Sequence, residues 1–455
     1  MIDPIRDLTD VLANDLCISC GACVHADGSL ELQLDDASQM FVPNGPGNAD
    51  AASICPAIQV DFPMLHDQLF PDQEPGPFGV VHSVMLAQSV DVERNRSASS
   101  GGIIKEVLTA RLRDPEVDGA IVLAREEGIE YRPTLITSPD EVDDLPGSIY
   151  HNTPKDRVLE LLRANEGRFV VVAIPCELEG LYQYVLRLQP ELLGRIHSTI
   201  GLLCGWQNTR HALRAICDFK DVDFDRLESV SYRGGGPLGE LRLGTDEGVT
   251  TVNRRRDLDH LVAFDRSFTM PRCHLCINHN NFLADIVVGD AWVDETSSTE
   301  TGVSIVINRR ESTDALMRQL ADEGRVVVVD VDTDVVERSQ KPRVAFGNFS
   351  YAYADFLRDR GVPAPLMDGP NRPVAELVDR DEVERFHTEF EAKRRLQRQR
   401  RYGWLRIRKV TKELRRFIGN SQELKRIRRR WARRLGLARD ADPVIEERES
   451  TLPFR

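Results

Sequence analysis

This sequence lacks the features that mark membrane proteins, secreted proteins and enzymes with a nucleophilic side chain. No apolar run approaches the roughly 18 residues that a membrane-spanning helix needs. The first residues, MIDPIRDLTD, are acidic and lack the apolar core of a signal peptide. No Ser-His-Asp or Cys-His set demands a nucleophilic mechanism. We therefore expect a cytoplasmic protein, in which metal ligation is a better use for the nine cysteines than disulfide bonds.

Charge is distributed unevenly along the chain. With 455 residues, 41% hydrophobic and 29% charged, the chain has the composition of a globular protein with two or three cores. Its net charge is −14, yet residues 393–439 contain 20 Lys or Arg and only two acids, a local charge of +18. The remaining chain therefore carries −32. A basic tail and an acidic body need separate explanations.

The first four cysteines follow the pattern of a ferredoxin-type iron–sulfur site. Cys17, Cys20 and Cys23 are spaced C-x2-C-x2-C in LCISCGAC, and Cys55 precedes a proline. A tight turn with two-residue gaps aims three thiolates at three corners of a 4Fe–4S cubane, and Cys55 is the candidate for the fourth corner. Structural zinc is the alternative, but zinc usually takes two separated C-x2-C pairs. The spacing favours the cluster.

Four further cysteines form a second candidate set. Cys176 and Cys204 each follow an apolar strand, at the carboxyl ends where α/β sheets build their sites. Cys273 and Cys276 form a second close pair. Small core residues are the alternative interpretation for Cys176 and Cys204. Cys217, the ninth cysteine, lies within an expected helix and fits buried packing.

A Ser/Gly loop separates an expected strand at 80–90 from a helix that begins at residue 103. The loop, SASSGG, would leave free backbone N–H groups at the helix N-terminus, as a phosphate cradle requires. A capped helix after a flexible turn explains the same residues equally well. The residues alone leave both interpretations open.

The order of the expected elements predicts an α/β (α+β) protein in three parts. An N-terminal ferredoxin-like cluster segment occupies residues 1–70. A central mixed α/β domain with the second cysteine set occupies residues 78–360. A basic amphipathic helical tail follows at 380–439, and residues 440–455 are expected to be disordered.

The tail has several possible roles. Trp404 and Trp431 lie on the apolar edges of two expected helices whose other faces are basic. This pattern fits attachment to an anionic surface, such as the inner face of the membrane. It also fits docking to an acidic partner or to the acidic body of the same chain. Two solvated helices packed on the body are the plainest alternative, and the acidic body disfavours nucleic acid as a ligand.

Five motifs follow one another along the chain: LCISCGAC, SASSGG, IPCELEG, LLCGW and CHLCINHNNFLADIVVGDAW. In this order they resemble the motifs of the family of coenzyme F₄₂₀ hydrogenase/dehydrogenase beta subunits, an iron–sulfur flavoprotein group that includes 7-hydroxymethyl chlorophyll a reductase. The resemblance covers roughly residues 16–350 and does not reach the basic tail. It is specific for the family and not for the substrate.

The resemblance implies two 4Fe–4S clusters and one FAD. The first cluster would be held by Cys17, Cys20, Cys23 and Cys55. The second would be held by Cys176, Cys204, Cys273 and Cys276. FAD would bind at the Ser/Gly loop and near an expected strand at 284–290, through Ser99, Ser100, Gly101, Gly102, Asp285, Gly289 and Asp290.

Two positions depart from the family's pattern. Ala173 and Ile174 stand where the family usually has Gly-Thr, and Asn278 stands where it usually has Asp. Neither change removes a candidate ligand, but both leave the substrate open.

The resemblance implies an oxidoreductase that passes electrons between its clusters and FAD. Coenzyme F₄₂₀ would be the two-electron partner, and ferredoxin or another redox protein the one-electron partner. One alternative is an FAD- and ferredoxin-dependent reductase of a specific organic substrate. Another is a non-catalytic electron-transfer or scaffold subunit. No catalytic proton donor can be chosen by sequence among His151, His274 and His279.

Overall fold

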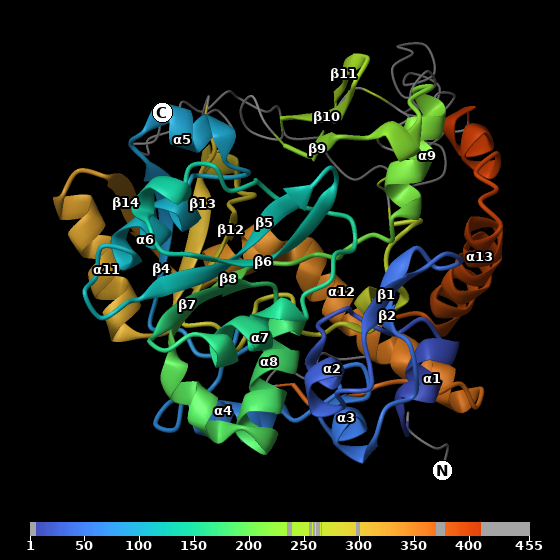
Figure 1. The fold of residues 1–455 in the computed structure, drawn as a ribbon, viewed down its shortest axis with the longest axis horizontal. Helices are drawn as coiled ribbons and strands as arrows, with labels where there is room; N and C mark the ends of the chain where they lie inside the picture. Colours follow the sequence, from blue (N-terminus) through green and yellow to red (C-terminus); the bar gives the residue numbers. More distant parts are fainter. Residues whose placement is uncertain are drawn as a thin grey trace, which may run out of the picture.

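A mixed eight-stranded sheet forms the centre of the computed structural model, which describes residues 6–233, 239–253, 257, 260, 264, 266–296, 301–369 and 378–410 (Figure 1). The strands in spatial order are β14 (Val326–Val331), β4 (Ser83–Ser89), β13 (Ser304–Asn308), β12 (Ile286–Asp290), β8 (Ile196–Leu202), β7 (Phe169–Ala173), β5 (Gly119–Glu127) and β6 (Glu130–Ile136). Neighbours from β12 to β5 are parallel, and the outer pairs are antiparallel. The predicted mixed α/β class is confirmed.

Helices cover both faces of this sheet because successive strand residues point to opposite sides. In β4, Val84 and Leu86 belong to one core, and Met85 and Ala87 to the other. The first core is closed by α4 (Phe62–Leu69), α7 (Arg157–Ala164) and α8 (Pro175–Leu188). The second is closed by α6 (Ile103–Arg111) and α11 (Glu311–Asp322), with α5 (Val92–Ser97) preceding α6.

The N-terminal segment packs on helices from the far end of the chain. Its elements are α1 (Leu8–Ala13), α2 (Ala22–Ala26), β1 (Leu32–Asp35), β2 (Met40–Pro43), α3 (Ala49–Ser53) and β3 (Gln59–Val60). The three helices among them share a core with α12 (Asp334–Asp359) and α13 (Arg380–Arg398). β3 pairs in parallel with β15 (Leu366–Met367). In Figure 1, α13 runs along the right-hand edge from this segment toward α9 (His211–Phe219).

A second, smaller sheet lies beside α9. It consists of β9 (Ser229–Ser231), β10 (Glu240–Thr245) and β11 (Gly248–Asn253), all antiparallel. Cys217, in α9, is 1% exposed in the core between this helix and the sheet. Short 3-10 helices occur at η1 (Pro139–Glu141), η2 (Pro190–Arg195), η3 (Phe224–Arg226), η4 (Pro271–Leu275) and η5 (Asp294–Thr296).

Only the beginning of the expected basic tail belongs to the described residues. α13 covers its first part, and residues 404–410 are helical. Residues 411–439 and the expected disordered end at 440–455 lie outside the described residues. Among the helices that the structure describes, none has the length and apolar character needed to cross a membrane.

Candidate redox site

A cavity of about 290 Å³ opens where β7, β8 and β12 end. The carboxyl ends of parallel strands are where open α/β sheets bind ligands. The cavity is bounded by the loop before α6, by residues 145–150 and by the three strand ends. Five of the residues predicted to bind flavin line it: Ser99, Ser100, Gly102, Gly289 and Asp290.

The other two predicted flavin residues, Gly101 and Asp285, do not line this cavity. A Cβ on Gly101 would lie 2.6 Å from the carbonyl oxygen of Ala87, so the glycine lets the loop pack against β4. Asp285 precedes β12, at the opposite end of that strand, and pairs with Arg310 at 2.7 Å. Its carboxylate also accepts hydrogen bonds from the backbone and hydroxyl of Thr199. Both residues hold the fold, and we leave them out of the site.

Hydrogen bonds fix the shape of the Ser/Gly loop. Ser100 Oγ donates to the carbonyl of Val303 at 3.0 Å, and Ser99 Oγ accepts from the backbone N–H of Ser148 at 2.7 Å. Gly102 begins α6 with φ +78°, a left-handed conformation that side chains rarely adopt. The loop is therefore held in one conformation at the start of the helix.

The cavity wall carries two buried cations. Arg233 Nη1 lies 3.1 Å from both carboxylate oxygens of Asp290. Lys105 Nζ donates to the backbone carbonyl of Asp143 at 2.8 Å, and burial lowers the pKa of Lys105. Lys105 thus places a cation beside the Ser/Gly loop, whereas the charge of Arg233 is balanced by Asp290.

The first cysteine set, Cys17, Cys20, Cys23 and Cys55, comes together between α2 and the end of α3. Burial raises the pKa of Cys17 to about 12 and that of Cys55 to about 11. For Cys20 and Cys23, burial and then the neighbouring thiols of the set raise the pKa. The four sulfur atoms are therefore close enough for a charge on one to affect the pKa of another.

Backbone N–H groups point at sulfur atoms of this set. The N–H of Ser19 donates to Cys17 Sγ at 3.4 Å, and other backbone N–H groups bond Cys20 and Cys55. Gly21 allows the tight turn, because its φ of +76° is one that side chains rarely adopt. Glycine is also needed because a Cβ at this position would lie only 2.3 Å from the Asp156 Cα. Hydrogen bonds of this kind favour the thiolate over the thiol.

The second cysteine set, Cys176, Cys204, Cys273 and Cys276, is also assembled. Cys176 is in the first turn of α8, Cys204 follows β8, and the last two lie in and after η4. Burial raises the pKa of Cys276, and the neighbouring Cys273 and Cys204 add to the rise. Cys204 also lines the cavity, so this set adjoins the candidate flavin site.

The two sets are adjacent. A Cβ on Gly180, one turn after Cys176 in α8, would lie 2.8 Å from Cys20 Sγ. Arg272 precedes a cysteine of the second set and donates at 3.2 Å to the carbonyl of Pro56, which follows a cysteine of the first. The sets therefore share a wall formed by α8 and η4.

Four charged residues in or beside this wall were not identified from the sequence: Lys155, Glu177, Glu179 and Arg272. Lys155 Nζ lies 3.6 Å from Glu177 Oε1. Glu179 accepts a 2.8 Å hydrogen bond from Asn278, and burial raises the pKa of Glu179 to about 7. The IPCELEG motif held one available signal, because it places two acids beside a cysteine in an apolar context.

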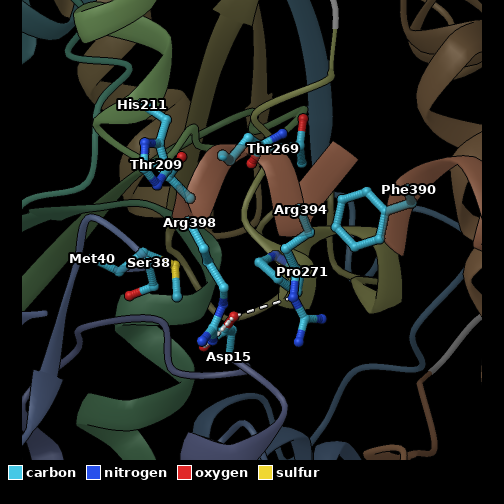
Figure 2. Close-up of a pocket in the computed structure, with 11 residues that line it drawn as sticks. Asp15, Ser38, Met40, Thr209, His211, Thr269, Pro271, Phe390, Arg394 and Arg398 are labelled. Carbon is cyan, nitrogen blue, oxygen red and sulfur yellow. Dashed lines mark hydrogen bonds and ion pairs between the residues drawn. The ribbon is translucent and has the colours of Figure 1, made fainter. Parts of the chain in front are cut away.

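The described part of the basic tail contacts the N-terminal segment. Figure 2 shows Arg394 and Arg398 directed at Asp15, with ion-pair distances of 3.2 and 2.6 Å. On the same helix, the Phe390 ring packs edge-on against His274. In the sequence, His274 lies between two cysteines of the second set. The beginning of the tail thus docks on the acidic body of its own chain, one of the alternatives left open by the sequence.

Comparisons with known proteins support the site's assignment to a family. Residues 84–160 match the N-terminal part of the coenzyme F₄₂₀ hydrogenase/dehydrogenase beta subunit, and residues 166–334 match its C-terminal part. A subunit of the F₄₂₀H₂ dehydrogenase of Methanosarcina mazei is 23% identical over 319 residues, which cover 65% of this chain and 82% of that protein. The beta subunit of the coenzyme F₄₂₀ hydrogenase of Methanococcus voltae is 23% identical, over 56% of this chain and 87% of that protein.

A solved structure shares the fold. A chain of the F₄₂₀-reducing NiFe hydrogenase complex from Methanosarcina barkeri superposes with a TM-score of 0.50 and 18% identity, over 64% of this chain and 98% of that chain. The two matched regions together exceed half of the 455 residues. The chain therefore belongs to the family of coenzyme F₄₂₀ hydrogenase/dehydrogenase beta subunits.

Proposed function

We propose that this chain is an iron–sulfur flavoprotein oxidoreductase that passes electrons between two 4Fe–4S clusters and FAD. The observation that carries the proposal is one continuous arrangement of two adjacent cysteine sets and a cavity, joined at Cys204. Coenzyme F₄₂₀ would be the two-electron partner, as the names of the relatives suggest. Ferredoxin or another redox protein would exchange single electrons.

The residues present fit two clusters. Eight thiols are grouped in fours, and backbone N–H groups are directed at several of their sulfur atoms, as at cluster ligands. Across the described ranges, no three His, Cys, Asp or Glu side chains converge as on a single metal ion. The four cysteines of a cubane surround the whole cluster and each binds a separate iron, so their sulfur atoms stand farther apart than the ligands of a single ion.

The cavity fits part of a flavin nucleotide. Its volume, about 290 Å³, is close to the lower end of ligand pockets, roughly 300–1,000 Å³. Phosphate groups would meet the Ser/Gly loop at the N-terminus of α6, with Lys105 and Arg233 on the same wall. A bound flavin would supply the conversion between one-electron and two-electron transfer. The chain's own groups would orient it and place Cys204 beside it.

A specific organic substrate is the second candidate, and one observation favours it. Ala173 and Ile174, which replace the family's usual Gly-Thr, both line the cavity. The substitution removes a hydroxyl from the wall where a two-electron partner would approach. Turnover with coenzyme F₄₂₀, measured against other two-electron acceptors, separates these candidates. A scaffold subunit would bind no flavin.

Metal and flavin analysis tests the proposal directly. Anaerobically purified protein should contain about eight irons and eight sulfides per chain, together with FAD. Cys20→Ser and Cys276→Ser should each lose one cluster, whereas Cys217→Ser, altered in a separate core, should lose none. About four irons in the unaltered chain would remove the second site. Stoichiometric zinc without iron or flavin would contradict the proposal.

A further inference from the structure

Lys155 lies where both cysteine sets and the cavity meet. The residue is 2% exposed. Its backbone N–H donates to the carbonyl of Ser19 at 3.0 Å, within the turn that carries the first cysteine set. Its Nζ lies 3.2 Å from Gln207 Oε1, and the Gln207 backbone donates to Cys273 Sγ at 3.4 Å. Gln207 also lines the cavity. One residue therefore contacts the surroundings of all three sites, through its backbone at the first set and through its side chain at the other two.

The position of Lys155 brings its charge near both sets. Its backbone bonds the carbonyl of Ser19, which lies between Cys17 and Cys20 in the turn of the first set. Its Nζ is within ion-pair distance of Glu177, which follows Cys176 of the second set. A single buried cation therefore lies beside the shared wall, close to both groups of thiols.

Glu177 partly balances this cation. Its Oε1 lies 3.6 Å from Lys155 Nζ, farther than the roughly 2.7–2.9 Å of a charge-assisted hydrogen bond. Its Oε2 accepts from the backbone N–H of Ile174 at 3.1 Å, so the carboxylate is fixed by the chain rather than by the lysine. Glu177 follows a cysteine of the second set and lines the cavity. Removing the charge of Lys155 or of Glu177 should therefore change the electrostatic potential at the neighbouring cysteine sets.

Two clusters held by these adjacent sets would oppose each other's reduction. A cubane with four thiolate ligands carries net negative charge, which increases by one electron on reduction, and that charge helps to set its potential. Inside a protein such charges are weakly screened. A buried cation between two such groups lowers the energy of the reduced form of each.

We propose that Lys155 is a positioning residue for electron transfer: its buried ammonium group, held between the two cysteine sets and balanced by Glu177, raises the reduction potentials of both clusters together. This inference rests on the proposed function, because it assigns a role toward clusters held by those sets. Lys155 would thereby shift the reduction potentials of the two clusters in the same direction.

Potentiometry of the full chain tests the inference. In Lys155→Met, which keeps the aliphatic stem but removes the charge, both clusters should become harder to reduce. We expect at least a tenfold fall in the reduced-to-oxidised ratio at fixed potential, which corresponds to about 59 mV for a one-electron couple. The readout is a redox titration followed by electron paramagnetic resonance. Lys155→Arg, which keeps the charge, should lie much closer to the unaltered chain.

Lys220→Met is the matched control. Lys220 is a partly buried lysine that, like Lys155, faces a carboxylate, with Asp257 at 2.6 Å, but it lies at the end of α9. Its replacement should leave both potentials unchanged. Equal shifts in Lys220→Met and Lys155→Met would mean that any lost charge acts alike, and the inference would be wrong.

The carboxylate provides an independent test with opposite sign. Glu177→Gln should raise both potentials, and Lys155→Met with Glu177→Gln should return them toward those of the unaltered chain. A purely structural role for Lys155 does not produce opposite shifts that cancel. If Lys155→Met fails to hold iron, the sign of the Glu177→Gln shift decides, and an absent or downward shift overturns the inference.

The outcomes separate this inference from the proposed function. An unaltered chain with eight irons, whose potentials do not move in Lys155→Met, overturns only the role of Lys155. An unaltered chain that binds no iron overturns the proposed function, and this inference with it.

Discussion

Gly180 sits in the middle of α8, where glycine weakens a helix by about 1 kcal/mol relative to alanine. The position is explained by what lies opposite. Cys20 Sγ occupies the space that a Cβ would need, at 2.8 Å. In α8, local helix stability is therefore lower at the point where a cysteine of the N-terminal segment approaches it.

Gly180→Ala should displace Cys20 even though alanine favours the helix. We expect loss of the first cluster, with iron falling from about eight to about four per chain, while the second cluster and the flavin stay. Iron analysis and electron paramagnetic resonance would measure this. Gly194→Ala is the control, because its Cβ would meet nothing within 4 Å. Full iron content in Gly180→Ala would contradict the close approach.

Single residues differ in how far their roles could be predicted from the sequence. The role of Cys17, Cys20 and Cys23 can be predicted from their spacing alone, because a single turn with two-residue gaps can carry three cluster ligands. Lys155 gives no such signal, since its contacts are with Ser19 and Gln207, both distant in the sequence. Roles that depend on distant neighbours cannot be assigned before the fold is known.

At the scale of elements, apolar runs predicted the strands that cross the core. The expected strand at 80–90 contains β4, and the expected strand at 284–290 contains β12. β13 was not predicted, although all five of its residues are buried, because only three of them are apolar. α12 was also missed: it contains a proline, which usually ends a helix, and has a non-helical residue at Gln340.

The contact between α9 and the chain after α13 should depend on pH. His211 Nε2 lies 3.0 Å from the Ala37 carbonyl and must donate to it, so Nδ1 accepts from the Tyr402 hydroxyl at 2.7 Å. Burial lowers the pKa of His211 to about 4, below its ordinary 6.5. Between pH 6.5 and 4 the imidazole is protonated in the unfolded chain but neutral in the folded one. The free energy of unfolding therefore falls as pH falls from 6.5 through 4.

His211→Gln should reduce that pH dependence, because glutamine can accept from Tyr402 and donate to Ala37 without titrating. We expect the free energy of unfolding to fall less steeply between pH 6.5 and 4, by about 3 kcal/mol at most. Chemical denaturation at several pH values would measure the slope. His82→Gln, at an exposed position, controls for loss of an imidazole. Identical slopes in the unaltered chain and in His211→Gln would refute the assignment.

At the scale of the whole molecule, the charge asymmetry is partly resolved within the chain. Arg394 and Arg398 pair with Asp15, and Arg400 pairs with Asp36. These basic residues are therefore engaged with the body. The sequence predicted opposite charges on tail and body, but it could not choose among lipid, partner and self-docking, because all three use the same charges.

The remaining basic residues, beyond Val410, should confer salt-sensitive binding to anionic surfaces. Residues 411–439 contain 11 Lys or Arg, each worth about 1 kcal/mol near an anionic bilayer. We expect the full chain to sediment with anionic vesicles at low salt and to be released at high salt. A chain ending at Val410, which keeps the docked segment, should stay in solution. Equal sedimentation of both forms would assign these residues to another role.

The contacts of the first cysteine set also bear on its biogenesis. The LCISCGAC turn is translated early, but the groups that enclose it are translated late. The Ser19 carbonyl accepts from Lys155, and that of Pro56 accepts from Arg272, which is 216 residues further along. A ribosome synthesises the N-terminus first, so these thiols emerge long before their enclosure exists. The enclosure of the first cysteine set can therefore be completed only after residue 272 has been synthesised, so this site closes late in the maturation of the chain.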